Sequence, residues 1–187
     1  LETGTRITAV LLTADAGDRP ALIARMKAAR EGLVALAAGD DVLREVDAFV
    51  AEVESGRLQA AELVPALDVL SERIHKALDT NTDNATATLV QAGGWVQGAH
   101  LLARALSRNE VTPDAAALFH QASLVHHFEL FLQASDPARA GDPRLKTVID
   151  RMKDLRFLAG QDDLGREQVQ DIQRLTGEII AAFRQSN

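Results

Sequence analysis

Residues 84–108, NATATLVQAGGWVQGAHLLARALSR, decide the fold of this chain. Their apolar residues have helical spacing, and they cover most of the circumference of the helix rather than a single stripe. We therefore predict a long central helix that is buried on several sides. Three glycines lie inside it, and each costs about 1 kcal/mol of helix propensity relative to alanine, so packing must offset them.

Two interpretations of these glycines stay open. Gly94 and Gly98 lie one turn apart on one face, where they would let a neighbouring helix approach closely, in this chain or in a second copy. Alternatively, Gly93-Gly94 breaks or kinks the helix and opens a small space beside Trp95. Such a space would be a ligand slot, with Trp95 as its wall. Its polar contacts would come from His100, His120 and His127.

Apolar residues recur with helical spacing in the rest of the chain as well. We predict an all-α fold, a single-domain bundle of seven or eight helices that covers residues 1–187 and surrounds the central helix. A strand is the alternative for the first segment, which is rich in β-branched residues. Besides the central helix, the predicted segments are residues 5–15, 20–38, 42–53, 59–79, 113–134, 143–159 and a last helix after the turn at 160–163 that includes Val169 to Phe183.

Capping and turn residues support these boundaries. Asp18, Thr112 and Asp142 each stand just before a proline-containing helix start, and Asp40 or Asp41 is expected to cap the third helix. The polar run at 79–84 is predicted to be a loop. The phenylalanines have the spacing of core residues: Phe49, Phe119, Phe128, Phe131, Phe157 and Phe183.

Composition excludes several classes of function. The 187 residues include 27 acidic and 20 basic ones, a net charge of -7, and this sign opposes nucleic acids and anionic membranes. Without cysteine there is no disulfide, thiol nucleophile or thiolate metal site. No run reaches the roughly 20 apolar residues that span a bilayer. The first residue, Leu1, and the absence of cysteine favour an exported bacterial domain, periplasmic or secreted, with a cytoplasmic one as the alternative.

No motif for catalysis is present. The chain lacks a phosphate-binding glycine loop, a zinc-protease helix motif and a serine nucleophile elbow, so no catalytic and no cofactor-binding residue is assigned. Paired E-x-x-H motifs hold di-iron centres in helical bundles. Glu72 and His75 form one such motif, but they point away from the apolar stripe of their helix. His126 and Glu129 lie nearer the apolar side of theirs.

The leading hypothesis is a non-enzymatic helical domain that binds a protein or a small molecule. The alternative is a metal- or cofactor-binding bundle that uses His100, His126, His127 and Glu129. His120 and His127 are expected on one face of one helix, two turns apart, which is too far for both to bind one metal ion. A third hypothesis is a homo-oligomer whose interface buries Gly94 and Gly98.

Overall fold

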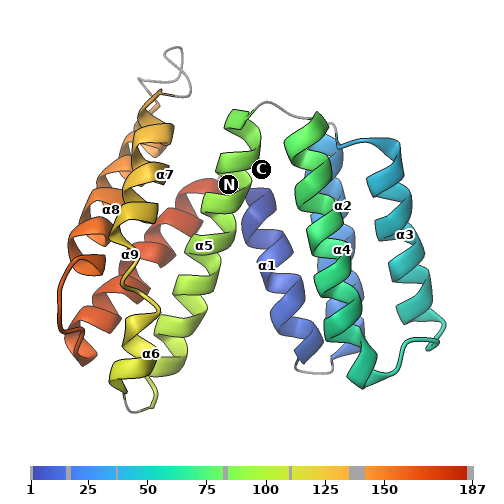
Figure 1. The fold of residues 1–187 in the computed structure, drawn as a ribbon, viewed down its shortest axis with the longest axis horizontal. Coiled ribbons are helices and arrows are strands. Elements are labelled where there is room, and N and C mark those ends of the chain that lie inside the picture. Colours follow the sequence, from blue (N-terminus) through green and yellow to red (C-terminus); the bar gives the residue numbers. More distant parts are fainter. Residues whose placement is uncertain are drawn as a thin grey trace. The chain divides into compact units, whose positions relative to one another are not determined.

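The computed structural model describes residues 2–15, 18–36, 38–81, 84–109, 111–134 and 142–184. The described residues form nine helices, and none of them lies in a strand (Figure 1). The all-α prediction is therefore confirmed. No helix within these ranges is both long enough and apolar enough to cross a membrane.

The helices belong to two compact units, which we describe separately. The N-terminal unit is Glu2–Gly94 and the C-terminal unit is Trp95–Asn187. Helix α5 (Asn84–Leu106) contributes its first half to the N-terminal unit and its second half to the C-terminal unit. The single domain over 1–187 stays a prediction.

Four helices enclose the core of the N-terminal unit: α1 (Glu2–Asp15), α2 (Arg19–Ala35), α3 (Asp40–Glu54) and α4 (Ala60–Asn81). Helix α1 packs against α2 and α4, and α3 packs against the same two helices (Figure 1). The core forms because each helix turns an apolar stripe inward. The stripe predicted for α4 is buried at Leu63, Leu67, Leu70, Ile74 and Leu78.

The structure decides the open alternative for the first segment and corrects two boundary details in this unit. Residues 5–15 are helical, so the strand alternative is wrong, and α2 ends at Ala35 rather than at residue 38. The cap of α3 is Gly39, without a side-chain hydrogen bond, because Asp40 already lies in the first helical turn. The cap predicted at Asp18 is present, and its carboxylate accepts the backbone N–H of Ala21 at 3.1 Å.

The helix α5 is continuous through Gly93-Gly94, so the alternative of a break there is wrong. The predicted loop at 79–84 is shorter than expected, because α4 continues one turn past the buried Leu78 to Asn81 and α5 begins at Asn84. Residues 82 and 83 lie outside the described residues. Buried side chains occur along α5 from Ala87 to Leu106, among them Val90, Val96 and Ala103.

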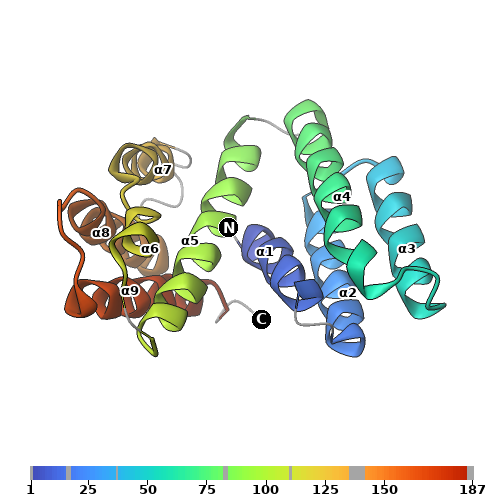
Figure 2. The same cartoon turned by 60° about the horizontal axis from the view of Figure 1, so that its bottom comes forward.

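The C-terminal unit contains the rest of α5 and four further helices: α6 (Pro113–Ala117), α7 (Ala122–Ala134), α8 (Pro143–Ala159) and α9 (Arg166–Arg184). Helix α8 packs against both α7 and α9 (Figure 2). Asp142 caps α8 as predicted, and its carboxylate accepts the backbone N–H of Arg144 at 2.9 Å. Its buried stripe includes Val148, Met152 and Leu155.

The single helix predicted over 113–134 is wrong, because residues 118–121 form a turn between α6 and α7. The physical reason is the placement of two phenylalanines. Phe119 and Phe128 are nine residues apart, which would put them on opposite faces of one straight helix at about 100° per residue. Both are buried, and the turn allows this.

Candidate functional site

The predicted wall of a ligand slot, Trp95, is half-buried and hydrogen-bonded within its own unit. Its indole N–H donates to Oε1 of Gln121 at 3.1 Å, and the amide of Gln121 donates to the carbonyl of Leu118 at 2.9 Å. The turn between α6 and α7 therefore supplies the partner of the indole. The sequence predicted no partner for the indole, and the helical pattern gave no signal for Gln121.

His100 joins the second half of α5 to α9. Its Nδ1 lies 3.1 Å from the carbonyl oxygen of Gln173 and 3.1 Å from Oγ1 of Thr176. A carbonyl can only accept, so Nδ1 carries the ring hydrogen. The Thr176 hydroxyl donates in turn to the carbonyl of Ile172 at 2.6 Å. His100 therefore acts in helix packing, as a polar side chain in this position requires.

His120 and His127 do not share a helical face, which corrects the prediction. His120 lies in the turn before α7 and is exposed. His127 is exposed on α7 itself, with its ring centroid 6.1 Å from those of Phe128 and Phe131. Because the prediction assumed one continuous helix, the turn at 118–121 removes its basis.

The side chain of Glu129 is buried at the contact between α7 and α8. Its Oε2 lies 3.0 Å from Nη1 of Arg156, and its Oε1 accepts from the amide of Gln133 at 3.0 Å. The same Arg156 nitrogen is 2.7 Å from Nδ1 of His126. A guanidinium only donates, so Nδ1 of His126 accepts and has no hydrogen for Glu129, although the two lie 3.4 Å apart. The cluster is an ion pair between two helices.

Of the four metal ligands predicted in the alternative, the structure brings His126 and Glu129 together. His100 bonds to α9 and the ring of His127 packs beside phenylalanines. Within the described residues, no group of three or more histidine or carboxylate side chains could hold a metal ion. On α4, Glu72 is exposed, as predicted, and the side chain of His75 lies outside the described residues.

The predicted pair of packing glycines is also corrected. A Cβ at Gly94 would lie 3.1 Å from Oγ1 of Thr8 on α1, whereas at Gly98 it would meet no described atom within 4 Å. The close approach involves Gly4 of α1, where a Cβ would lie 1.9 Å from the carbonyl oxygen of Val90. Gly94 thus packs against α1, and the homo-oligomer that buries Gly94 and Gly98 stays a prediction.

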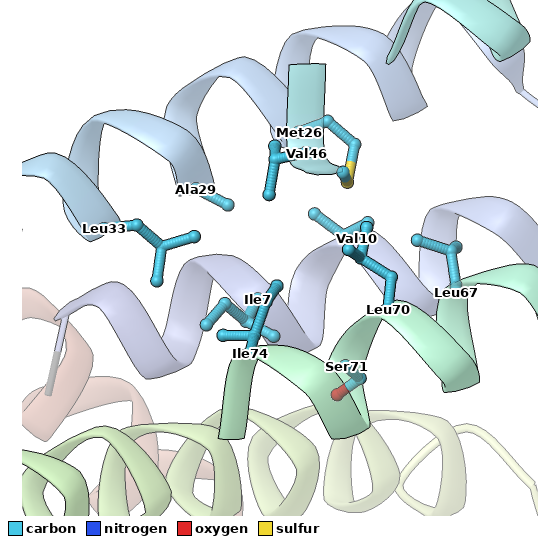
Figure 3. A pocket seen from close by; sticks show the side chains of 10 residues that line it. All are labelled: Ile7, Val10, Met26, Ala29, Leu33, Val46, Leu67, Leu70, Ser71 and Ile74. Carbon is cyan, nitrogen blue, oxygen red and sulfur yellow. The ribbon is translucent and has the colours of Figure 1, made fainter. Parts of the chain in front are cut away.

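A cavity of about 20 Å³ lies in the core of the N-terminal unit. Figure 3 shows its lining: Ile7, Val10, Met26, Ala29, Leu33, Val46, Leu67, Leu70, Ser71 and Ile74. This volume accommodates about one water molecule, but a buried water needs two to four polar partners and the lining offers one hydroxyl. The cavity is therefore a packing void, too small for an organic ligand.

An open groove of about 350 Å³ lies between the start of α8 and the end of α9, lined by Arg144 and Glu178 among others. Both charges are engaged with neighbours. Arg144 bonds Asp142 and lowers the pKa of that carboxyl to about 2. Burial raises the pKa of Glu178. Hydrogen bonds from Arg174 and Arg151 have the larger, opposite effect together, so that the pKa lies below its usual value. Arg144 and Glu178 are therefore both paired within the chain, and neither offers the groove an unpaired charge.

The outward side of α7 is an unusual surface. Six of its residues are exposed and none is charged; we call them the outer α7 face: Ser123, Leu124, His127, Leu130, Gln133 and Ala134. Every other helix with exposed residues in the described ranges has at least one charged residue among them. On the neighbouring α8, Phe157 is 72% exposed, so its prediction as a core residue is wrong.

Comparisons with known proteins give no relative for this chain. No family model matches it, and no match was found among curated proteins or solved structures.

Proposed function

We propose that this chain is a non-enzymatic protein-binding domain and that its contact surface is the outer α7 face. The observation that carries the proposal is the exposure of Leu130, at 50%, on a helix face without a charged residue. Exposed apolar surface of this kind costs free energy in water and is typical of interaction sites. The centre of a protein interface is likewise depleted of charge.

The same degree of exposure has a different setting on α4. Val69 is 51% exposed there, but Asp68, Glu72 and Arg73 are exposed around it. Single apolar residues among charges are normal on protein surfaces and need no partner. The difference between α4 and α7 is therefore in the surroundings of the apolar residue and not in its exposure.

The charge distribution supports the choice of the C-terminal unit. The N-terminal unit contains 15 acidic and 9 basic residues, a net charge of -6. The C-terminal unit contains 12 acidic and 11 basic residues, a net charge of -1. A partner that approaches the C-terminal unit is therefore little affected by long-range repulsion.

A binding role rather than catalysis fits the positions of the polar candidates. Trp95, His100 and His126 each spend a ring nitrogen on a hydrogen bond to another element of their own unit. Such bonds hold elements together. The proposal includes a location outside the cytoplasm, in the periplasm or secreted, with the cytoplasm as the alternative, since a chain without cysteine fits either compartment.

The test compares two variants of equal exposure. Leu130→Glu places a charge on the outer α7 face, and Val69→Glu places the same charge on α4, with circular dichroism to confirm that both fold. The proposal is supported if the wild-type chain and Val69→Glu capture a protein that Leu130→Glu does not capture. Titration of that purified partner must then show weaker binding to Leu130→Glu than to the other two chains. Equal capture by all three chains contradicts it.

A further inference from the structure

We infer that the outer α7 face pairs with the same face of a second copy of this chain, antiparallel and around a twofold axis at His127. This inference rests on the proposed function and names its partner. The central residues of the face are Leu124, His127 and Leu130. A leucine thus stands three residues before the histidine and three residues after it.

That spacing is symmetric about its centre. At 1.5 Å per residue, each leucine lies about 4.5 Å along the helix axis from His127. A twofold axis through His127 reverses the direction of the second helix. It therefore places Leu124 of one copy opposite Leu130 of the other, twice, with the two His127 side chains at the middle. The pattern is self-complementary, as an interface around a twofold axis requires.

The charges permit this pairing at α7 and oppose it elsewhere. A twofold axis brings identical residues near one another, so a charged face meets like charges, which destabilises the contact. On α3 the exposed residues include Asp41, Arg44, Asp47 and Glu54, three of them acidic. The outer α7 face has no such group, and its unit has a net charge of only -1.

The extent of α7 sets the expected strength. Thirteen residues correspond to a helix of about 20 Å, so two such faces bury less area than the roughly 1,600 Å² of a standard interface. The exposed Phe157 on the adjacent α8 adds apolar surface in the C-terminal unit. We therefore expect reversible pairing, with a dissociation constant of roughly 10 µM to 1 mM.

Sedimentation velocity of the full chain over about this concentration range tests the inference. The weight-average sedimentation coefficient of the wild-type chain should rise with concentration. Val69→Glu should behave like the wild type, and Leu130→Glu should weaken association at least about tenfold. A wild-type chain that stays monomeric, or a Leu130→Glu chain that associates equally well, overturns the inference.

A second measurement uses the absence of cysteine from the chain. His127→Cys introduces a single thiol at the proposed axis, where two copies lie within disulfide distance. Under mild oxidation this variant should form a covalent dimer much faster than Val69→Cys, and adding Leu130→Glu should slow it. Equal rates of covalent dimer formation for His127→Cys and Val69→Cys overturn the inference. This comparison holds even if Leu130→Glu fails to fold.

The two proposals fail in different ways. A monomeric wild-type chain whose capture of another protein depends on Leu130 overturns self-pairing and supports the protein-binding function. If neither self-association nor any captured protein depends on Leu130, both proposals are wrong.

Discussion

Helices α3 and α7 are similar in length, and each buries one side in the core of its own unit, but their polar residues are arranged in opposite ways. The exposed residues of α3 are Asp40, Asp41, Arg44, Asp47, Ala48, Ala51 and Glu54, so charges face water. Helix α7 has one charged residue, Glu129, and it points inward to Arg156. Its outward side, the outer α7 face, has two leucines at its centre and no carboxylate, lysine or arginine.

This difference teaches that a periodic apolar stripe shows which side of a helix is buried, but not whether the opposite side is charged. Both helices bury a stripe that includes a phenylalanine, Phe49 in α3 and Phe128 in α7. In α3, the opposite side is one that water solvates well. In α7, the opposite side would gain free energy if it were covered. The following predictions test this contrast, from the largest expected effect to the smallest.

Removal of the partner of Glu129 should have the largest effect. Arg156→Ala leaves a buried carboxylate with Gln133 as its donor and His126, 3.4 Å away, as a weaker substitute for the guanidinium. We expect a loss of about 2 kcal/mol of unfolding free energy. The loss is below that for a fully buried pair because Arg156 is partly exposed. Urea unfolding measures it.

A double variant and an exposed pair control this result. Glu129→Gln combined with Arg156→Ala should recover part of the loss, because no buried charge is then left unpaired. On α3, Asp47 pairs with Arg30 at the surface, and Arg30→Ala should change stability much less. Equal losses for Arg156→Ala and Arg30→Ala would mean that the inward charge of α7 does not differ from a surface charge.

Leu124→Glu should weaken self-association less than Leu130→Glu does. Leu124 is 38% exposed, so less of its side chain is available to a partner. We expect roughly a fivefold increase in the dissociation constant, equivalent to about 1 kcal/mol. Val64→Glu, at 37% exposure on α4, is the matched control and should leave the sedimentation profile unchanged. If Val64→Glu weakens association as much as Leu124→Glu does, association does not depend specifically on the outer α7 face.

An apolar residue placed on α3 should not produce an association surface. Ala48→Leu and Ala51→Leu together give α3 two exposed leucines, but Asp47 and Glu54 remain nearby. Like charges across a twofold axis oppose pairing, so sedimentation at high concentration should match that of the wild type. Concentration-dependent association of this double variant would show that exposed leucine alone is sufficient.

The smallest measurable change concerns the start of α8, which is capped by Asp142, whereas α3 has no side-chain cap. Bonds from Arg144 lower the pKa of Asp142 from 3.8 to about 2. A lowered folded-state pKa adds stability that is present above the unfolded value and is lost as the pH falls towards 2. Asp142→Asn, which keeps a capping oxygen, should therefore flatten the fall in stability between pH 4 and 2 in denaturant titrations. An unchanged slope contradicts this assignment.

Much of the helical architecture was predictable because local rules decide it. The stripe of α4 and the caps at Asp18, Thr112 and Asp142 depend on residues within a few positions of one another. The turn at 118–121 was not predictable in this way. It depends on burying both Phe119 and Phe128, which is a property of the packed unit and not of the local pattern.

The candidate site was less predictable than the helices. Histidine and tryptophan were noticed for their chemistry, but Trp95 bonds to Gln121 and His100 to α9, which only the packed helices bring near. Helices α1 and α5 come closest at Gly4, and a single glycine gives no periodic signal in the sequence. The outer α7 face was hidden because leucines at helical spacing look the same whether they are buried or exposed.

The amino-acid sequence by itself determined that this protein is helical, where most helices begin, and that cysteine chemistry is excluded. These properties follow from backbone propensity, capping and composition, which act within a few residues or on the chain as a whole. Only the tertiary structure decided that Glu129 is buried and Leu130 is exposed on the same helix. The reason is that burial depends on which side of a helix its neighbours cover, and those neighbours are distant in the sequence.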